Sequence, residues 1–142
     1  MKPQFIRLIW IAVVVVVAAG CTQEPTARKD QERAFTQTFG FPPTGEIADI
    51  SYHSASAWAP NFGGYLSLMR FTYVPSIVER IDQKYGLSLQ SAAPATVEKP
   101  PEWWRKPSPQ QQIFYAATNG VVRCLWIDRE HGFVFYQEFN VD

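Results

Sequence analysis

Three groups of residues in this 142-residue chain carry side chains that could do chemistry. The first places Asp128, Glu130 and His131 in one short segment, where two carboxylates and an imidazole could bind a metal ion or exchange protons. Asp at the start of a tight loop and a Gly at its end, here Gly132, are also what a turn requires. We therefore interpret this segment as a turn, and we predict no metal site.

The other two groups lack partners for catalysis. His53 is next to Ser54, but adjacent residues of a strand point to opposite faces, and no G-x-S-x-G turn accompanies them. Cys124 would need nearby positive charge to become a nucleophile, whereas its place between Val122 and Trp126 favours a buried thiol. We predict that the protein is not an enzyme and uses no cofactor, with a small hydrolase as an alternative.

Aromatic residues in predicted loops are the best candidates for a binding surface. Exposed tryptophans stack on sugars and anchor protein interfaces. The alternative is that a small domain uses such residues to fill its core and hold its loops in place. The predicted partner contacts are Trp58, Phe62, Trp103, Trp104 and Arg105.

Local patterns predict the elements that would position these residues. Five segments have the composition or the alternation of strands, namely residues 48–55, 65–73, 113–118, 121–127 and 133–139. Asn119-Gly120 is typical of a type I′ hairpin turn. This turn predicts the cross-strand pairs Ile113 with Trp126, Tyr115 with Cys124, and Ala117 with Val122. The face of Phe133 and Phe135 depends on whether the preceding loop has four or five residues, and this alternative stays open.

One helix is predicted at residues 76–85. Ser76 and Glu79 have the spacing of a capping box, and Ile77 and Ile81 lie on one stripe. Gly86 is suited to end the helix in a left-handed conformation. We expect an α+β fold with a small antiparallel sheet of about five strands, in the order β-β-α-β-β-β. The helix and a docked tryptophan segment should cover one face of that sheet.

Composition divides the rest of the chain. Residues 21–37 are polar and charged, which predicts a flexible tether, and residues 38–142 form a single domain. Within that domain, residues 88–111 contain five prolines and should be irregular. The Trp103-Trp104 centre of this segment is too apolar for a free linker, so we expect at least one tryptophan to dock on the domain.

Residues 1–20 have the organisation of a secretory signal. Lys2 and Arg7 precede an apolar run from Leu8 to Ala19, and small residues lead to Cys21. This run is much shorter than the roughly 20 residues that cross a membrane. With cysteine directly after Gly20, the segment resembles the signal peptide of bacterial lipoproteins. Ordinary secretory cleavage is the alternative.

The resemblance implies cleavage between Gly20 and Cys21, with Cys21 carrying the lipid. It implies an extracytoplasmic, membrane-anchored protein, and Thr22 favours the outer membrane, facing the periplasm, over the inner membrane. With a lipid on Cys21, Cys124 would have no intramolecular disulfide partner.

Charge excludes one class of partner. The chain has 13 basic and 13 acidic residues, and removal of residues 1–20 leaves 11 against 13, a net charge of −2. Without a basic stripe, nucleic acid is not an expected partner. We therefore expect a lipid-anchored binding or accessory protein of the cell envelope that contacts an envelope protein or a glycan. A tethered inhibitor or immunity-type protein is the alternative, followed by a small envelope hydrolase.

Overall fold

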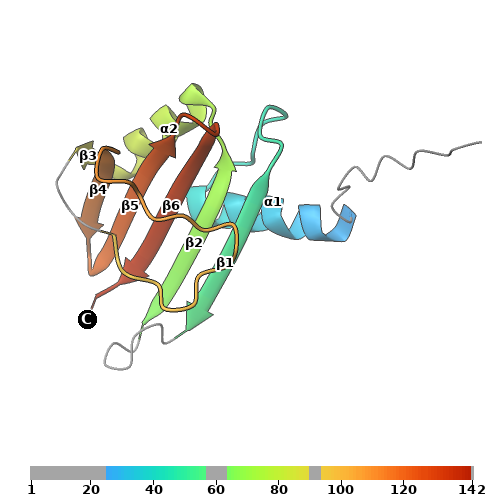
Figure 1. Cartoon of the computed structure of the whole chain (residues 1–142). Coiled ribbons are helices and arrows are strands. Elements are labelled where there is room, and N and C mark those ends of the chain that lie inside the picture. The colour runs from blue at the N-terminus through green and yellow to red at the C-terminus, as the bar shows by residue number, and fades with distance from the viewer. Residues whose placement is uncertain (1–24, 57–63, 90–93, 142) are drawn as a thin grey trace, which may run out of the picture.

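The computed structural model describes residues 25–56, 64–89 and 94–141, and it shows an α+β fold (Figure 1). The predictions for residues 1–20, Cys21, Trp58 and Phe62 lie outside the described residues.

Within the described residues, six antiparallel strands form one sheet in the order β1-β2-β6-β5-β4-β3. About five were expected. The sixth is β3, a two-residue strand at the start of the Pro-rich segment, which pairs with the N-terminal half of β4. The strands are β1 (Ile50–Ser56), β2 (Tyr65–Thr72), β3 (Ser88–Leu89), β4 (Ile113–Thr118), β5 (Val121–Asp128) and β6 (Phe133–Asn140).

The β4–β5 hairpin has the predicted turn and register. Both turn residues have positive φ, 52° at Asn119 and 75° at Gly120, as a type I′ turn requires. The three predicted cross-strand pairs are confirmed: Ile113 with Trp126, Tyr115 with Cys124, and Ala117 with Val122.

A four-residue loop joins β5 to β6, because Asp128 pairs with Phe133. Phe135 consequently lies opposite Trp126, and both phenylalanines share the face of that tryptophan. This decides the alternative that the sequence left open.

Helix α2 (Pro75–Tyr85) begins with proline and not with a capping box. Val74 occupies the cap position in an extended conformation, and no side chain caps the helix. The predicted Ser76–Glu79 capping box is therefore wrong, because the fixed φ of Pro75 starts the helix two residues earlier than a cap at Ser76 would. The predicted end is confirmed: Gly86 is left-handed (φ 61°), and its N–H donates to the Asp82 carbonyl over 2.7 Å.

A second helix, α1 (Pro25–Phe39), occupies most of the segment that was expected to be a flexible tether. That prediction is wrong from residue 25 onward. Phe35 and Phe39 are one helical turn apart and fully buried, with ring centroids 4.7 Å apart. Their contacts with Phe71 and Tyr136 of the sheet order a segment that is otherwise polar.

Both helices cover one face of the sheet, and the irregular chain from residue 94 to residue 112 crosses the other (Figure 1). The helix and the tryptophan segment were expected on the same face, so that prediction is wrong. The reason is that β2 is apolar on both faces, with Leu66 and Leu68 on one side and Met69 and Phe71 on the other. Each face therefore needs its own cover.

Two cores result. The helix-side core contains Ala34, Phe35, Phe39, Phe41, Ile47, Ile50, Met69, Phe71, Val74, Ile77, Ile81, Leu87, Ala116, Leu125, Val134 and Tyr136. The core under the Pro-rich segment contains Leu66, Leu68, Trp104, Val122, Cys124, Trp126, Phe135 and Phe139.

Candidate functional site

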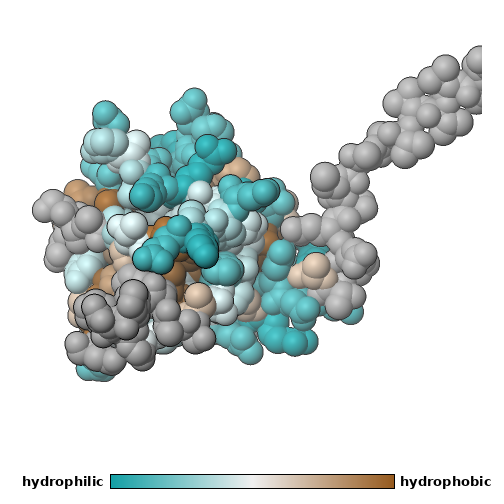
Figure 2. All heavy atoms as spheres, turned by 60° about the horizontal axis from the view of Figure 1, so that its bottom comes forward, coloured by the Kyte–Doolittle hydropathy of each residue, from teal (hydrophilic) through white to brown (hydrophobic). Residues whose placement is uncertain are grey.

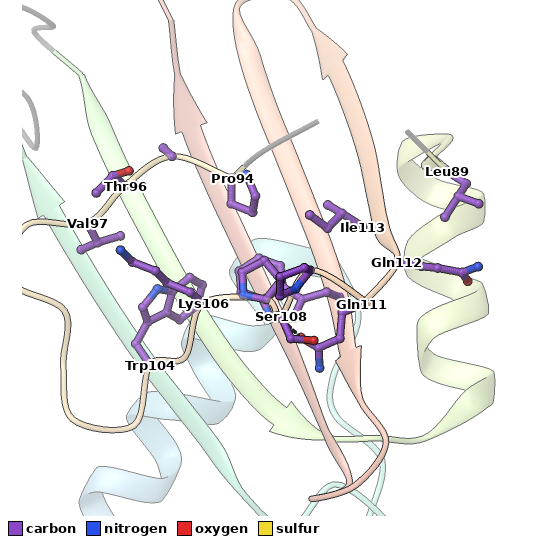
Figure 3. Close-up of a pocket in the computed structure, with 14 residues that line it drawn as sticks. Leu89, Pro94, Thr96, Val97, Trp104, Lys106, Ser108, Gln111, Gln112 and Ile113 are labelled. Atoms are coloured by element: carbon purple, nitrogen blue, oxygen red, sulfur yellow. Dashed lines mark hydrogen bonds between the residues drawn. The ribbon is translucent and has the colours of Figure 1, made fainter. Parts of the chain in front are cut away.

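A hollow of about 720 Å³ lies between the Pro-rich segment and the sheet (Figure 3). In a view from the lower end of the molecule, apolar residues show between hydrophilic ones (Figure 2). The hollow is lined by Leu89, Pro94, Ala95, Thr96, Val97, Trp104, Lys106, Pro107, Ser108, Pro109, Gln111, Gln112, Ile113 and Trp126. This volume and this largely apolar lining are typical of sites for small molecules.

Two tryptophans form the base of the hollow. Trp126 of β5 is almost fully buried, and it stacks on Phe135 with ring centroids 5.8 Å apart. Trp104 of the irregular segment packs edge-on against Trp126, at 5.1 Å between centroids. The β5–β6 register presents Trp126 and Phe135 on one face, and this pair is the surface on which Trp104 docks. The expectation that one tryptophan docks on the domain is confirmed.

A buried glutamine holds one wall in place. Gln137 of β6 has no exposed surface, and its side-chain amide makes two hydrogen bonds with the main chain of Ala95. The Ala95 N–H donates to Gln137 Oε1 over 2.8 Å, and Gln137 Nε2 donates to the Ala95 carbonyl over 2.9 Å. The two hydrogen bonds hold the irregular segment against the face of the sheet that it crosses (Figure 1).

The opposite wall is held by Gln111. Its Oε1 accepts from the Ser108 N–H over 2.8 Å, and its Nε2 donates to the Ile127 carbonyl over 3.4 Å. The Ser108–Gln111 turn also closes through its main chain, over 3.0 Å. The hollow is therefore shaped by fixed walls without regular secondary structure.

The polar side chains at the hollow differ in whether they are already engaged. Gln111 is used within the protein, whereas the side chains of Lys106, Thr96 and Ser108 make no hydrogen bond or ion pair with another described residue. In Figure 3 the Lys106 side chain lies beside Trp104, with its ammonium end toward Thr96 and Val97. Among the described lining residues, Lys106 is the one charged group.

The three predicted contact residues that the structure describes differ in exposure. Trp104 is only 8% exposed, so it is mainly a core residue. Trp103 is half-buried, with the Arg70 guanidinium 5.9 Å from its ring centroid, and Arg105 is exposed. Sequence reasoning missed Gln137 and Lys106. A lone Gln on the same strand face as Phe133, Phe135 and Phe139 was the available signal for a buried amide that needs a partner.

No protein-family model matches this chain, and no curated protein or solved structure matches it. The described helices include none with the length and apolar character needed to cross a membrane.

The Asp128–His131 loop has the geometry of a turn. Asp128 accepts from the His131 main chain over 3.2 Å and contacts the ring Nδ1 over 2.8 Å, and its own carbonyl accepts from Gly132. Burial acts to raise the pKa of Asp128, but the hydrogen bonds from His131 hold it below its ordinary value. Within the described part of the chain, no three His, Cys, Asp or Glu residues are grouped to hold a metal ion.

The remaining candidates are also separated from one another. Cys124 is a free, fully buried thiol, and burial raises its pKa to about 11, so it is not a thiolate near neutral pH. His53 pairs with Leu68, while the exposed Ser54 pairs with Ser67.

In a polar cluster on the helix side of the sheet, the side chains form hydrogen bonds with one another. Glu138 accepts from Arg123 over 2.9 Å, from the Tyr65 hydroxyl over 2.6 Å and from the Tyr136 hydroxyl over 2.8 Å. The carboxylate is thus already balanced by one cation and two hydroxyls, which is typical of a structural ion pair.

Proposed function

We propose that this protein is a non-catalytic binding protein of the cell envelope, and that it binds the apolar part of an envelope molecule in the hollow. The observation that carries the proposal is the hollow itself, which has a tryptophan base, two hydrogen-bonded walls and polar side chains with no engaged partner among the described residues. Such a site needs little reorganisation when a ligand enters.

The chemistry of the lining supports binding over catalysis. The described lining residues include no Asp, Glu, His or Cys, the side chains that most often serve as general acids, bases or nucleophiles. Lys106, Thr96 and Ser108 are the reactive types present, and no hydrogen bond among the described residues joins either hydroxyl to Lys106. The lining thus favours a ligand that is bound and released without chemical change.

We further propose that a lipid on Cys21 holds the domain at the membrane, with the outer membrane favoured. Since α1 begins at Pro25, only Thr22, Gln23 and Glu24 separate it from Cys21. At about 3.6 Å per residue, Cys21 and Pro25 can be at most roughly 14 Å apart. The domain would then lie close to the bilayer and could take ligands from it.

An envelope protein or a glycan stays a proposed partner for the residues outside the hollow. Arg105 is exposed and Trp103 is partly exposed on the same segment, so both are accessible beside the site. An aromatic ring with a neighbouring guanidinium suits either partner.

Site-specific crosslinking in living cells tests the proposed site. A benzophenone amino acid replaces Gln112, which lines the hollow, or Gln110, which is exposed on the same segment but does not line it. After irradiation, we expect an added ligand mass on the protein labelled at Gln112 and none on the protein labelled at Gln110. Intact-mass spectrometry of the purified full chain gives the readout.

Equal adducts at both positions would show contact with the surface and not with the hollow. Adducts at Gln110 alone, or at neither position, would also overturn the proposal. Near-ultraviolet circular dichroism of both variants controls for the fold around the tryptophans.

A further inference from the structure

The electrostatics of the hollow select the charge of its ligand. Lys106 brings one positive charge, and no carboxylate among the described lining residues opposes it. A cationic ligand would be repelled by this ammonium, and no carboxylate would offset the repulsion. A neutral ligand would form no ion pair with it. A ligand with a single negative charge satisfies it.

The donors near that charge limit the kind of anion. Besides the ammonium of Lys106, Thr96 offers a hydroxyl on the side toward which that ammonium points, whereas Ser108 and the Gln112 amide lie elsewhere around the hollow (Figure 3). Phosphate sites in proteins usually gather guanidinium groups or several backbone N–H groups. The prolines at 94, 107 and 109 cannot supply such N–H groups. One ammonium and one hydroxyl match a carboxylate better.

The rest of the surface selects an apolar body. Trp104, Trp126, Val97 and Ile113 offer hydrocarbon and ring surface, and burial of each ligand methylene there is worth about 0.8 kcal/mol, close to fourfold in affinity. A volume of about 720 Å³ has room for a chain many carbons long.

From these observations we infer that the ligand is a monocarboxylate with an apolar chain, of the fatty-acid class, and that Lys106 binds its carboxylate while the chain lies on Trp104 and Trp126. This inference rests on the proposed function, because it assigns a chemical class to the ligand of the same hollow.

Three probes with the same chain and different head groups test it on the full-length protein. Octanoate, octan-1-ol and octylamine are titrated below their aggregation limits, and binding is followed by tryptophan fluorescence and calorimetry. Octanoate should bind about three- to fivefold more tightly than octan-1-ol, which is the upper part of the range for an exposed charge pair. Octylamine should bind most weakly, and hexanoate should bind roughly fifteenfold more weakly than octanoate.

A matched pair of variants assigns the effect to Lys106. Lys106→Met keeps an unbranched side chain but removes the charge, and Lys99→Met does the same at an exposed lysine of the segment that does not line the hollow. The first variant should bind octanoate and octan-1-ol equally, while the second keeps the preference. Unchanged octan-1-ol affinity in Lys106→Met shows that the hollow is intact.

Different failures have different meanings. If the wild-type protein binds octanoate and octan-1-ol equally, or if Lys106→Met keeps the preference, the inference fails and the hollow remains a neutral apolar site. If none of the three probes binds while Gln112 still forms crosslinks in cells, the inference fails and the proposed function stands for a ligand of another class. If neither the probes bind nor the crosslinks form, both the inference and the proposed function fail.

Discussion

Gln137 is the side chain on which the position of one wall of the hollow depends. It is fully buried and makes both of its hydrogen bonds with the main chain of Ala95. A buried amide without hydrogen-bond partners lowers the stability of the folded state. If Gln137 were replaced, the N–H and carbonyl of Ala95 would likewise lose their partners. The position is therefore specified more strictly than the apolar positions around it.

Replacing this glutamine tests its structural role. Gln137→Leu should lower the free energy of unfolding by about 2–4 kcal/mol, because two main-chain groups and their partner are lost together. Urea unfolding followed by tryptophan fluorescence measures the loss. Gln83→Leu, at an exposed position on α2, is the control and should change stability by less than about 0.5 kcal/mol. A cost below about 1 kcal/mol for Gln137→Leu would contradict the role.

The buried thiol of Cys124 should make the stability of the protein depend on pH. Burial raises the pKa of its thiol to about 11 from the ordinary 9.0, so the unfolded chain loses this proton first. The contribution of the buried neutral thiol to the free energy of unfolding is fully present below pH 9. It is lost as pH rises from about 9 to about 11. Between pH 8 and pH 10 the protein should lose about 1 kcal/mol of stability through this group.

Cys124→Ala isolates that contribution. The variant is expected to be less stable at every pH because it leaves a small cavity, but its decline between pH 8 and pH 10 should be shallower by about 1 kcal/mol. Buried Tyr136 also has a raised pKa, chiefly through desolvation, and its contribution to the decline remains in both proteins. Parallel declines in the two proteins would contradict the assignment.

At the scale of elements, the two faces of the sheet are covered by different kinds of structure. Helices α1 and α2 cover one face, and an irregular segment with a tryptophan at its centre covers the other (Figure 1). An irregular cover packs less completely than a helix, since it lacks a continuous apolar stripe. The incomplete packing under this segment is the hollow.

Helix α1 should behave as part of the domain and not as an appendage. Phe39→Ala is expected to lower the free energy of unfolding by about 3–5 kcal/mol, because the ring is fully buried against Phe71 and Tyr136. Chemical denaturation monitored by circular dichroism measures this. Lys29→Ala on the exposed side of the same helix should have almost no effect. Equal stability of the Phe39→Ala variant and the wild-type protein would restore the tether interpretation.

At the scale of the whole molecule, the proposed anchor and the folded domain are close neighbours in the chain. A lipid on Cys21 would keep Pro25, the first residue of α1, within roughly 14 Å of the lipid-bearing residue. This limits how far the domain can move from the bilayer. A ligand of the fatty-acid class would then be taken up where such molecules are concentrated.

Substitution of the cysteine tests the anchor. Cys21→Ser should release the protein from the membrane fraction, because one lipid-bearing residue supplies the attachment. Fractionation followed by immunoblotting gives the readout, and Cys124→Ala is the control that keeps Cys21. The wild-type protein should have the mass of a chain that starts at Cys21 plus a diacylglyceryl group. That mass without the added lipid would establish ordinary secretory cleavage instead.

The local elements were determined by the sequence itself. Asn119-Gly120 specifies a turn that fixes the register of β4 and β5, and Gly86 specifies the end of α2, since both depend on backbone preferences of adjacent residues. Only the tertiary structure decided the fate of Phe35 and Phe39, the face on which Trp104 docks, and the partner of Gln137. These depend on contacts between residues far apart in the chain, with energies that no local pattern contains. The candidate site consists of such contacts, so its tryptophans were visible in the sequence but its cavity was not.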